Sequence, residues 1–218
     1  MKRFLAAFLL FAASALPAAA QSYTDIDVDL PMFPEMQPVP DSPVYWAPGV
    51  DSNYFFYNGL FWDYFHDLWH WSAWYNGPWM VADPVYVPTY VLWVPIRYYR
   101  KPTPYIAAGN PNRPPRWSEF WGTEWQARHN EIYRGAAGPF ARAPLPTYQA
   151  QFGRGNYPRN PQQQFMIHGQ NYAYQPREAV SRQVYQARGV IVTANPTLRG
   201  HSPPPPDGRR DDAPRERR

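Results

Sequence analysis

A dense aromatic block in the first half of the chain constrains the fold more than any other feature. Between Ser52 and Trp79, 13 of 28 residues are Phe, Trp or Tyr, and the tripeptide Tyr-Asn-Gly occurs twice, at Tyr57 and at Tyr75. Asn-Gly readily adopts the positive φ angles of a two-residue hairpin turn, and aromatic residues favour strands. The block therefore predicts an antiparallel β-meander built largely from Trp and Tyr side chains.

Each Tyr-Asn-Gly tripeptide predicts the turn of a hairpin. The first hairpin has strands at Tyr54–Tyr57 and Leu60–Phe65, and the second has strands at 71–75 and 78–82. The polar dipeptide at 66–67 begins the connection between the hairpins. The fold class that follows is mainly β: a small antiparallel aromatic β-meander, accompanied by one short Trp-rich helix and a long disordered C-terminal tail.

Two apolar runs follow the second hairpin, at 85–87 and 90–94, and prolines interrupt them. Proline donates no hydrogen bond to a sheet ladder, so we expect both runs at the sheet edge or as extended cover. Aromatic residues stand next to one another in the predicted strands, which makes both faces of the sheet aromatic. One face therefore needs either a cover or a ligand.

The first 20 residues have the three-part pattern of a secretory signal peptide: cationic Lys2 and Arg3, an apolar run, and three alanines before Gln21. The apolar run is too short to span a bilayer, which takes about 20 residues. The chain contains no Cys, which excludes disulfides and thiol chemistry. We expect a mature chain that begins at Gln21 and is periplasmic or secreted in a Gram-negative cell envelope, with no transmembrane span after cleavage.

Charge is distributed unevenly along the mature chain. Residues 21–96 contain nine acids and no Lys or Arg, whereas residues 97–218 contain 19 Lys or Arg and eight acids. All of these cations except Lys101 are Arg, which favours planar, bidentate contacts. The basic part is therefore expected to contact the acidic aromatic core or an anionic surface such as lipopolysaccharide phosphate, or to remain solvated.

Composition divides the mature chain into five segments. They follow the signal peptide (1–20) and are an acidic Pro-rich arm with an edge strand at 25–30 (21–48), the aromatic β-meander core (49–100), a Pro-rich extended linker (101–116), an amphipathic Trp helix (117–134) and an Arg-, Pro- and Gln-rich tail (135–218). Trp117, Trp121 and Trp125 recur every four residues and so predict the helix. The tail lacks the hydrophobic density to offset chain entropy, so we expect disorder apart from a short helix at 177–188.

No strong catalytic constellation stands out in the sequence. The best metal candidate is Asp63-x-x-His66-Asp67-x-x-His70, whose histidines would lie one turn apart on a helix, but the surrounding pattern favours strand and loop. Asp63 with Asp67 could also serve glycoside hydrolysis, although a core of this size leaves little room for a substrate cleft. We therefore expect no enzyme, no cofactor and no metal.

Three short blocks carry a resemblance: Tyr75-Asn-Gly-Pro-Trp79, Tyr86-Val-Pro88, and Val94-Pro-Ile-Arg-Tyr-Tyr-Arg100. Together with the Trp-rich helix they resemble a group of short, uncharacterised aromatic-rich exported proteins of proteobacteria. The resemblance covers the signal peptide and residues 53–131, and it implies no established activity. The spaced aromatic and Gly pattern is also loosely similar to choline- and glucan-binding repeats, which are longer and occur in larger arrays.

The sequence predicts a function based on interaction. We expect a non-enzymatic envelope protein that acts as an interaction or scaffold module through its aromatic sheet and its Arg/Pro-rich tail, with a protein or peptide as partner. The alternative is a module that binds a cell-envelope glycan or lipopolysaccharide on an exposed Trp/Tyr face, and a hydrolase using Asp63, Asp67 or His66 is a third reading. Nucleic acid is not expected as a partner, because the compartment lacks it. The candidate binding residues are Tyr57, Trp62, Trp71, Trp74, Tyr75, Trp79, Trp117, Trp121 and Trp125.

Overall fold

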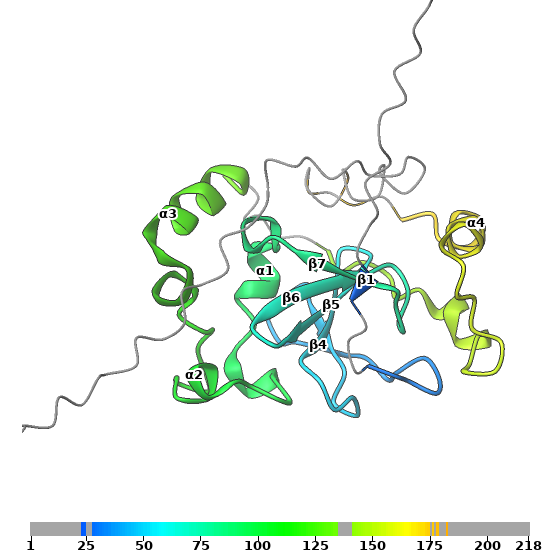
Figure 1. Cartoon of the computed structure of the whole chain (residues 1–218), viewed down its shortest axis with the longest axis horizontal. Coiled ribbons are helices and arrows are strands. Elements are labelled where there is room, and N and C mark those ends of the chain that lie inside the picture. Colours follow the sequence, from blue (N-terminus) through cyan, green and yellow to red (C-terminus); the bar gives the residue numbers. More distant parts are fainter. Residues whose placement is uncertain are drawn as a thin grey trace, which may run out of the picture.

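An antiparallel β-sheet forms the centre of the computed structural model, which describes residues 23–24, 28–134, 141–174, 176, 178 and 182 (Figure 1). The sheet has seven strands in the order β1-β7-β6-β5-β4-β3-β2. They are β1 (Tyr23–Thr24), β2 (Gln37–Pro38), β3 (Tyr45–Trp46), β4 (Tyr54–Tyr57), β5 (Leu60–Phe65), β6 (Leu68–Ser72) and β7 (Trp79–Ala82). The fold is mainly β and the sheet is rich in aromatic residues, which confirms the predicted fold class.

The hairpin around Asn58-Gly59 forms as predicted. β4 and β5 pair in register from Tyr54 opposite Asp63 to Tyr57 opposite Leu60. Asn58 and Gly59 have φ angles of 52° and 86°. A two-residue type I′ turn requires a positive φ at both central positions, and Asn-Gly reaches these angles with little strain.

The second hairpin differs from the prediction. β6 begins at Leu68, and the two-residue turn that leads into it is His66-Asp67, with φ angles of 49° and 60°. β6 and β7 pair with Trp71 opposite Met80, so the chain between the two strands, including Asn76-Gly77, is a longer loop. Pro78 explains the difference, because a two-residue turn at Asn76-Gly77 would need an N–H at position 78 and proline has none.

The N-terminal arm completes both edges of the sheet. β1 pairs with β7 at one edge, and β3 and β2 extend the sheet beyond β4 at the other. The predicted edge strand at 25–30 is displaced: the strand lies at Tyr23–Thr24, residues 28–30 are not a strand, and residues 25–27 lie outside the described part. Both edge strands are only two residues long, which limits edge-to-edge pairing with other chains.

Short helices occupy the segment after β7. They are η1 (Pro84–Tyr86), α1 (Thr89–Leu92), η2 (Ile96–Tyr98), α2 (Pro104–Ala107) and α3 (Trp117–Ile132). The predictions of extended runs at 85–87 and 90–94 are therefore wrong, and the predicted extended linker at 101–116 contains one helical turn at 104–107. Pro84 and Pro104 stand in the first turn of their helices, where the missing N–H would have had no helical partner.

α3 is the predicted Trp helix with a break inside it, and it ends at Ile132 rather than at 134. Gly122 has φ 84° and ψ 173°, a conformation that glycine adopts readily but that interrupts a helix. The stack of indole rings continues across the break. The ring centroids of Trp117 and Trp121 are 4.6 Å apart, and those of Trp121 and Trp125 are 4.8 Å apart.

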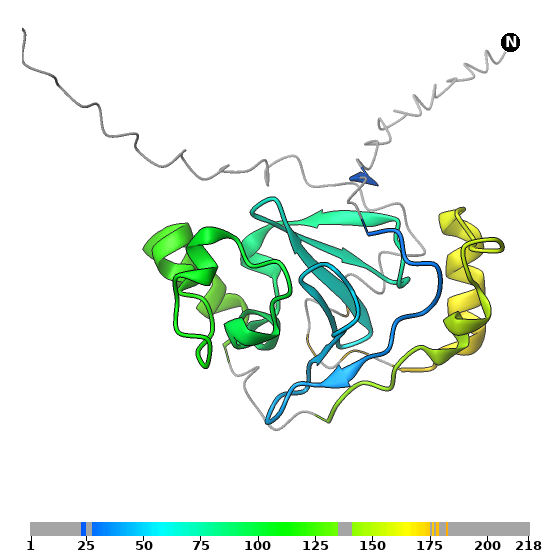
Figure 2. The same ribbon diagram turned by 90° about the horizontal axis from the view of Figure 1, so that it is seen from below.

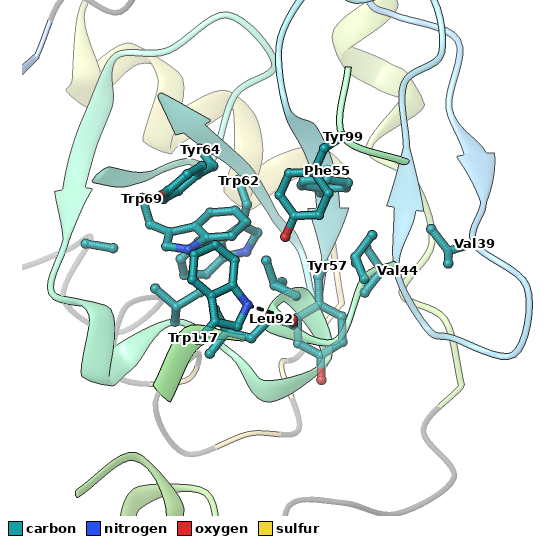
Figure 3. Close-up of a cluster of buried hydrophobic side chains, with 14 of the residues drawn as sticks. Val39, Val44, Phe55, Tyr57, Trp62, Tyr64, Trp69, Leu92, Tyr99 and Trp117 are labelled. Carbon is teal, nitrogen blue, oxygen red and sulfur yellow. Dashed lines mark hydrogen bonds between the residues drawn. The ribbon is translucent and has the colours of Figure 1, made fainter. Parts of the chain in front are cut away.

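The segment from η1 to α3 covers one face of the sheet, which we call the helical face. Figure 3 shows Trp117 of α3 beside Trp69 and Tyr64 of the sheet, with ring centroids 5.9 Å and 5.2 Å away. The Trp117 indole N–H donates to the carbonyl oxygen of Leu92 at 2.9 Å. The Trp helix therefore packs on the aromatic sheet, as its amphipathic pattern requires, and also on α1.

The opposite face, which we call the C-terminal face, is covered by residues 28–36 and by residues 141–174. The second segment contains η3 (Thr147–Gln151) and α4 (Pro161–Asn171). Figures 1 and 2 show α4 on the side of the sheet away from α2 and α3. Within the described residues, none of the helices has the length and apolarity that crossing a membrane takes.

The prediction of a disordered tail over 135–218 is wrong for residues 141–174. Gln149 is fully buried, its Oε1 accepts from the Tyr75 N–H at 3.0 Å, and its Nε2 donates to the Ala73 carbonyl at 2.9 Å. Gln164 donates to the Gly77 carbonyl at 2.9 Å. Buried glutamines thus attach this segment to the loop between β6 and β7. The hydrophobic density of a sequence gives no indication of such contacts. The predicted helix at 177–188 lies outside the described residues apart from Glu178 and Arg182.

Candidate functional site

The structure places most of the nine candidate aromatic residues in the core. Those with at most 5 % exposure are Tyr57, Trp62, Trp74, Tyr75, Trp79 and Trp117, and those that are half-buried are Trp71, Trp121 and Trp125. They do not gather into one surface. Trp62 and Trp117 belong to the helical face, whereas Tyr75 and Trp79 belong to the C-terminal face. In the described part of the chain, both aromatic faces are covered by the protein's own segments.

The four residues of the metal candidate do not converge either. Asp63 and His70 lie directly opposite one another on β5 and β6 and are buried, while His66 and Asp67 form the exposed turn between these strands. The His66 ring stacks on Phe65, with centroids 4.0 Å apart. Among the residues that the structure describes, no group of three or more His, Cys, Asp or Glu side chains could hold a metal ion.

Asp63 is the most unusual titratable group of the sheet. Its carboxyl group is fully buried and accepts hydrogen bonds from the Ser52 hydroxyl at 2.8 Å and 2.5 Å. Burial raises the pKa of Asp63 from its usual 3.8 to about 8, against the hydrogen bond from Ser52, which lowers it. Burial also lowers the pKa of His70. Both groups are therefore predominantly uncharged at neutral pH, as expected for polar side chains enclosed in a core.

Exposed positive charge lies elsewhere in the molecule, on the segment from η2 to the start of α3. Between Asp83 and Glu119 the sequence contains five cations and no acid. All five cations are exposed: Arg97, Arg100, Lys101, Arg113 and Arg116. We call these five residues the arginine surface.

Backbone contacts fold the arginine surface into a closed loop. The Ile96 N–H donates to the Arg113 carbonyl and the Arg97 N–H donates to the Pro111 carbonyl, both at 3.0 Å. These bonds hold the two ends of the loop next to one another, so Arg97 and Arg113 lie on neighbouring backbone. The Tyr105 hydroxyl of α2 donates to the Arg116 carbonyl at 2.9 Å and so brings Arg116 to the same loop.

Asn53 fixes this loop to the sheet. Its side chain is buried, Nδ2 donates to the Lys101 carbonyl at 2.7 Å, and Oδ1 accepts from the Lys101 N–H at 2.9 Å. Tyr99 adds an apolar anchor, because its buried ring packs against Phe55 with centroids 5.1 Å apart. The cations are thus carried by a loop that is attached to the core at two points.

Acidic partners within the protein neutralise only part of the arginine surface. Lys101 pairs with Asp51 at 2.6 Å, and Arg116 pairs with Glu119 at 2.8 Å. Arg97 donates to the neutral Asn112 side chain at 2.8 Å, and its guanidinium lies 5.1 Å from the centre of the Tyr98 ring. Arg97, Arg100 and Arg113 form no ion pair with another described residue.

Exposed aromatic side chains flank these cations in the chain. Trp93 is 53 % exposed and packs edge-on against Tyr90, with centroids 5.8 Å apart. Tyr105 is 36 % exposed and lies beside Phe120. Sequence reasoning missed Trp93, because it stands in an apolar run that was assigned to the sheet edge. The stretch without acids between Asp83 and Glu119 is the sequence signal that could have located this surface.

The cations of the following segment have a different role. Arg154 pairs with Asp29 of the N-terminal arm at 2.9 Å, and the Arg142 guanidinium donates to the Val39 carbonyl at 3.0 Å. Arg154 thus pairs with an acid of the N-terminal arm and not with the aromatic core (49–100) that the charge distribution predicted as the contact, and Arg142 bonds to a neutral carbonyl of the same arm. Comparisons with protein-family models, with curated proteins and with solved structures find no match.

Proposed function

We propose that the protein is an exported, non-enzymatic interaction module of the cell envelope that binds an acidic protein or peptide through the arginine surface. The observation that carries this proposal is the set of five exposed cations between Asp83 and Glu119, of which only Lys101 and Arg116 pair with an acid of the described chain. Unpaired guanidinium groups favour bidentate contacts with the carboxylates of a partner.

The side chains around the cations support a polypeptide partner. Trp and Tyr supply large contact areas at low cost in side-chain entropy, and Trp, Tyr and Arg are the residues most enriched at the energetic centres of protein interfaces. Trp93 offers such a ring four positions before Arg97, and Tyr105 offers another, whose hydroxyl donates to the Arg116 carbonyl. The aromatic sheet, which the sequence predicted as a contact together with the Arg/Pro-rich tail, has in this proposal the role of the body that carries the loop.

The proposed location in the envelope rests on the first 20 residues, which have the pattern of a secretory signal peptide. Export would place the arginine surface among envelope proteins and keep it away from nucleic acid. Cell fractionation followed by N-terminal sequencing tests this part of the proposal. We expect the protein in the periplasmic fraction or the medium, with Gln21 as its first residue.

The binding proposal is tested by reversing two charges. The double variant R97E/R113E is compared with R128E/R159E, which changes the net charge equally at two exposed arginines outside the loop. Tagged mature proteins capture partners from a solubilised envelope extract at about 50 mM and about 500 mM salt, and mass spectrometry quantifies them. We expect R97E/R113E and high salt to reduce the captured partner about tenfold or more, and R128E/R159E to retain it.

Two results would contradict the proposal. If R97E/R113E captures the same proteins as the wild type in the same amounts, the arginine surface is not the binding site. If the captured material is lipopolysaccharide or glycan and contains no protein that depends on Arg97 and Arg113, the partner class is wrong.

A further inference from the structure

The chain returns to the sheet at the turn of the first hairpin, far from the arginine surface in sequence. The Tyr174 hydroxyl donates to Asn58 Oδ1 at 2.7 Å, and the Tyr57 hydroxyl donates to Glu178 Oε1 at 2.6 Å. These bonds link residues 116 and 121 positions apart. Tyr174 and Glu178 therefore anchor a late part of the chain on the β4–β5 turn through side chains.

Glu178 is buried, which is unusual for its residue type. Its exposure is 5 %, whereas glutamates are almost never fully buried unless they are paired. Removing a carboxylate from water costs several kcal/mol unless hydrogen bonds or charges compensate it. The short bond from Tyr57 is a compensation of the charge-assisted kind. A segment that merely lay on the surface would keep its glutamate in water, so Glu178 acts as an anchor.

Tyrosines from three separate elements surround this carboxylate. Tyr90 of α1 packs against Tyr57 of β4, with ring centroids 5.8 Å apart. Burial and then the negative charge of Glu178 raise the pKa of Tyr57, of Tyr90 and of Tyr133, which follows α3. These effects agree with a carboxylate that enters between the first hairpin and the helical segment.

The residues around Glu178 are held in place by contacts that do not involve Tyr174 or Glu178. Asn58 is held in the type I′ turn, and the Tyr133 hydroxyl donates to the Tyr86 carbonyl at 2.7 Å. The Nδ2 group of Asn58 is buried and has no hydrogen-bond partner among the described residues. A ligand with an additional acceptor at this point would satisfy that donor, so the described residues do not use the full capacity of the site.

Glu178 is also held through its backbone. The Arg182 N–H donates to the Glu178 carbonyl at 2.9 Å, and Arg182 is exposed. The feature that the tyrosines receive is thus a buried glutamate whose carbonyl accepts a hydrogen bond from the residue four positions later.

We infer that Tyr57, Asn58 and Tyr90 form a binding site for a glutamate-bearing polypeptide segment, which the chain's own Glu178 fills and which a partner protein carrying a glutamate in the same setting can occupy in its place. In the free protein the occupants are the side chains of Tyr174 and Glu178. This site uses no residue of the arginine surface, so the inference does not depend on the function proposed above.

The test measures whether removal of Glu178 opens the site. The probe is a fluorescein-labelled synthetic peptide with the sequence of residues 172–186, and its control is the same peptide with Glu178→Gln. Fluorescence anisotropy reports binding to the full-length wild type, to E178A and to E178A/Y57F. We expect E178A to bind the probe about tenfold or more tightly than the wild type does, because its own segment no longer competes.

The control peptide and the Y57F change determine whether the carboxylate is recognised. Each is expected to weaken binding to E178A about tenfold or more, since a hydrogen bond to a charged group is lost. If E178A does not bind the probe, or if it binds the control peptide equally well, the inference is wrong.

Proteolysis gives an independent measurement on the same proteins. Trypsin should cleave after Arg182 about tenfold or more rapidly in E178A than in the wild type, while cleavage after Arg154 is unchanged. Equal rates after Arg182 would show that Glu178 does not anchor the segment and would overturn the inference. If cleavage after Arg154 also accelerates, E178A has lost its fold, and the comparisons are then made with E178Q, which keeps the shape of the side chain.

Discussion

The two faces of the sheet are covered in different ways. The helical face is covered by the segment that immediately follows β7, and its core is aromatic and aliphatic, with rings of Phe55, Trp69 and Trp117 in contact. The C-terminal face is covered by residues 28–36 and by residues 141–174, and the second segment attaches through rings that pack on Trp74 and Tyr75 and through the buried polar side chains of Gln149 and Gln164. One cover is therefore held by apolar packing, and the other by apolar packing together with hydrogen bonds to the loop between β6 and β7.

This difference explains why the two covering segments have different sequence patterns. Apolar packing leaves a periodic pattern, as in Trp117, Trp121 and Trp125, and the pattern predicts a buried helix face. A glutamine that bonds to buried backbone leaves no pattern, because its partner is a peptide group that every residue has. A region of low hydrophobic density can therefore be ordered when its polar side chains satisfy backbone groups elsewhere.

The largest effect is expected on the helical face. Trp69→Ala removes a fully buried ring that lies within 5.2 Å of the Tyr64 ring, centre to centre, and leaves a large cavity. We expect a loss of about 3–5 kcal/mol in the free energy of unfolding, measured by urea denaturation. Val81→Ala, at a position that is 45 % exposed, is the control and should change it by less than about 1 kcal/mol. A small effect of Trp69→Ala would mean that this face is not the main source of stability.

The sequence predicted the parts of the fold that depend on local backbone chemistry. Asn58-Gly59 defined one hairpin, and the Trp spacing defined α3, although Gly122 breaks that helix. The same dipeptide at Asn76-Gly77 gave a wrong prediction, because the following Pro78 has no N–H with which to close a two-residue turn. His66-Asp67 was predicted to begin the connection between the hairpins and not to form a two-residue turn, because His and Asp adopt positive φ but signal such a turn less strongly than Asn-Gly does.

The candidate sites were less predictable than the fold. Aromatic residues suit both cores and binding platforms, and only the positions of the covering segments show that Trp62, Trp74 and Trp79 are core. Trp93 is exposed and directly follows α1, a four-residue helix that was not predicted in this proline-rich stretch. The sequence placed Glu178 only within the predicted short helix at 177–188, and its burial depends on Tyr57, which lies 121 positions earlier in the chain.

The second prediction concerns Asp63, which lies on the C-terminal face in the cross-strand row Tyr54-Asp63-His70. Its pKa is about 8 in the folded protein and near 3.8 when the chain is unfolded. Between these values the folded state holds a proton that the unfolded state has lost. The stabilisation is complete below pH 3.8 and decreases by about 1.4 kcal/mol per pH unit until about pH 8.

Asp63→Asn should remove this decrease. Between pH 5 and pH 7 the free energy of unfolding of the wild type should fall by about 2–3 kcal/mol more than that of the variant, as measured by urea denaturation at each pH. The control is Asp41→Asn at an exposed turn, where Asn tolerates the positive φ of 55°, and its pH profile should follow the wild type. Parallel profiles for Asp63→Asn and the wild type would show that Asp63 is not a buried neutral acid.

The third prediction tests the buried hydrogen bonds of the covering segment 141–174. Gln149→Ala leaves the Tyr75 N–H and the Ala73 carbonyl without their partner, so we expect a loss of about 2 kcal/mol. Hydrogen exchange should accelerate in η3 and α4 and remain slow in α3. Gln163→Ala, at an exposed position of α4, is the matched control and should change neither. Equal acceleration in α3 would mean that the two covers unfold together and that the contrast between them has no energetic counterpart.

The smallest effect is expected from removing a single hydroxyl group of the covering segment 141–174. The Tyr157 hydroxyl donates to the Gly77 carbonyl at 2.6 Å and accepts from the Asn76 N–H at 3.1 Å. Tyr157→Phe keeps the ring, which packs against Tyr75 with centroids 5.2 Å apart, and removes only these two bonds. We expect a loss of about 1 kcal/mol in urea denaturation, against almost none for Tyr98→Phe on the opposite side of the sheet. A loss near zero for Tyr157→Phe would assign the attachment of this segment to ring packing, and the two covers would then differ in sequence pattern but not in the kind of force that holds them.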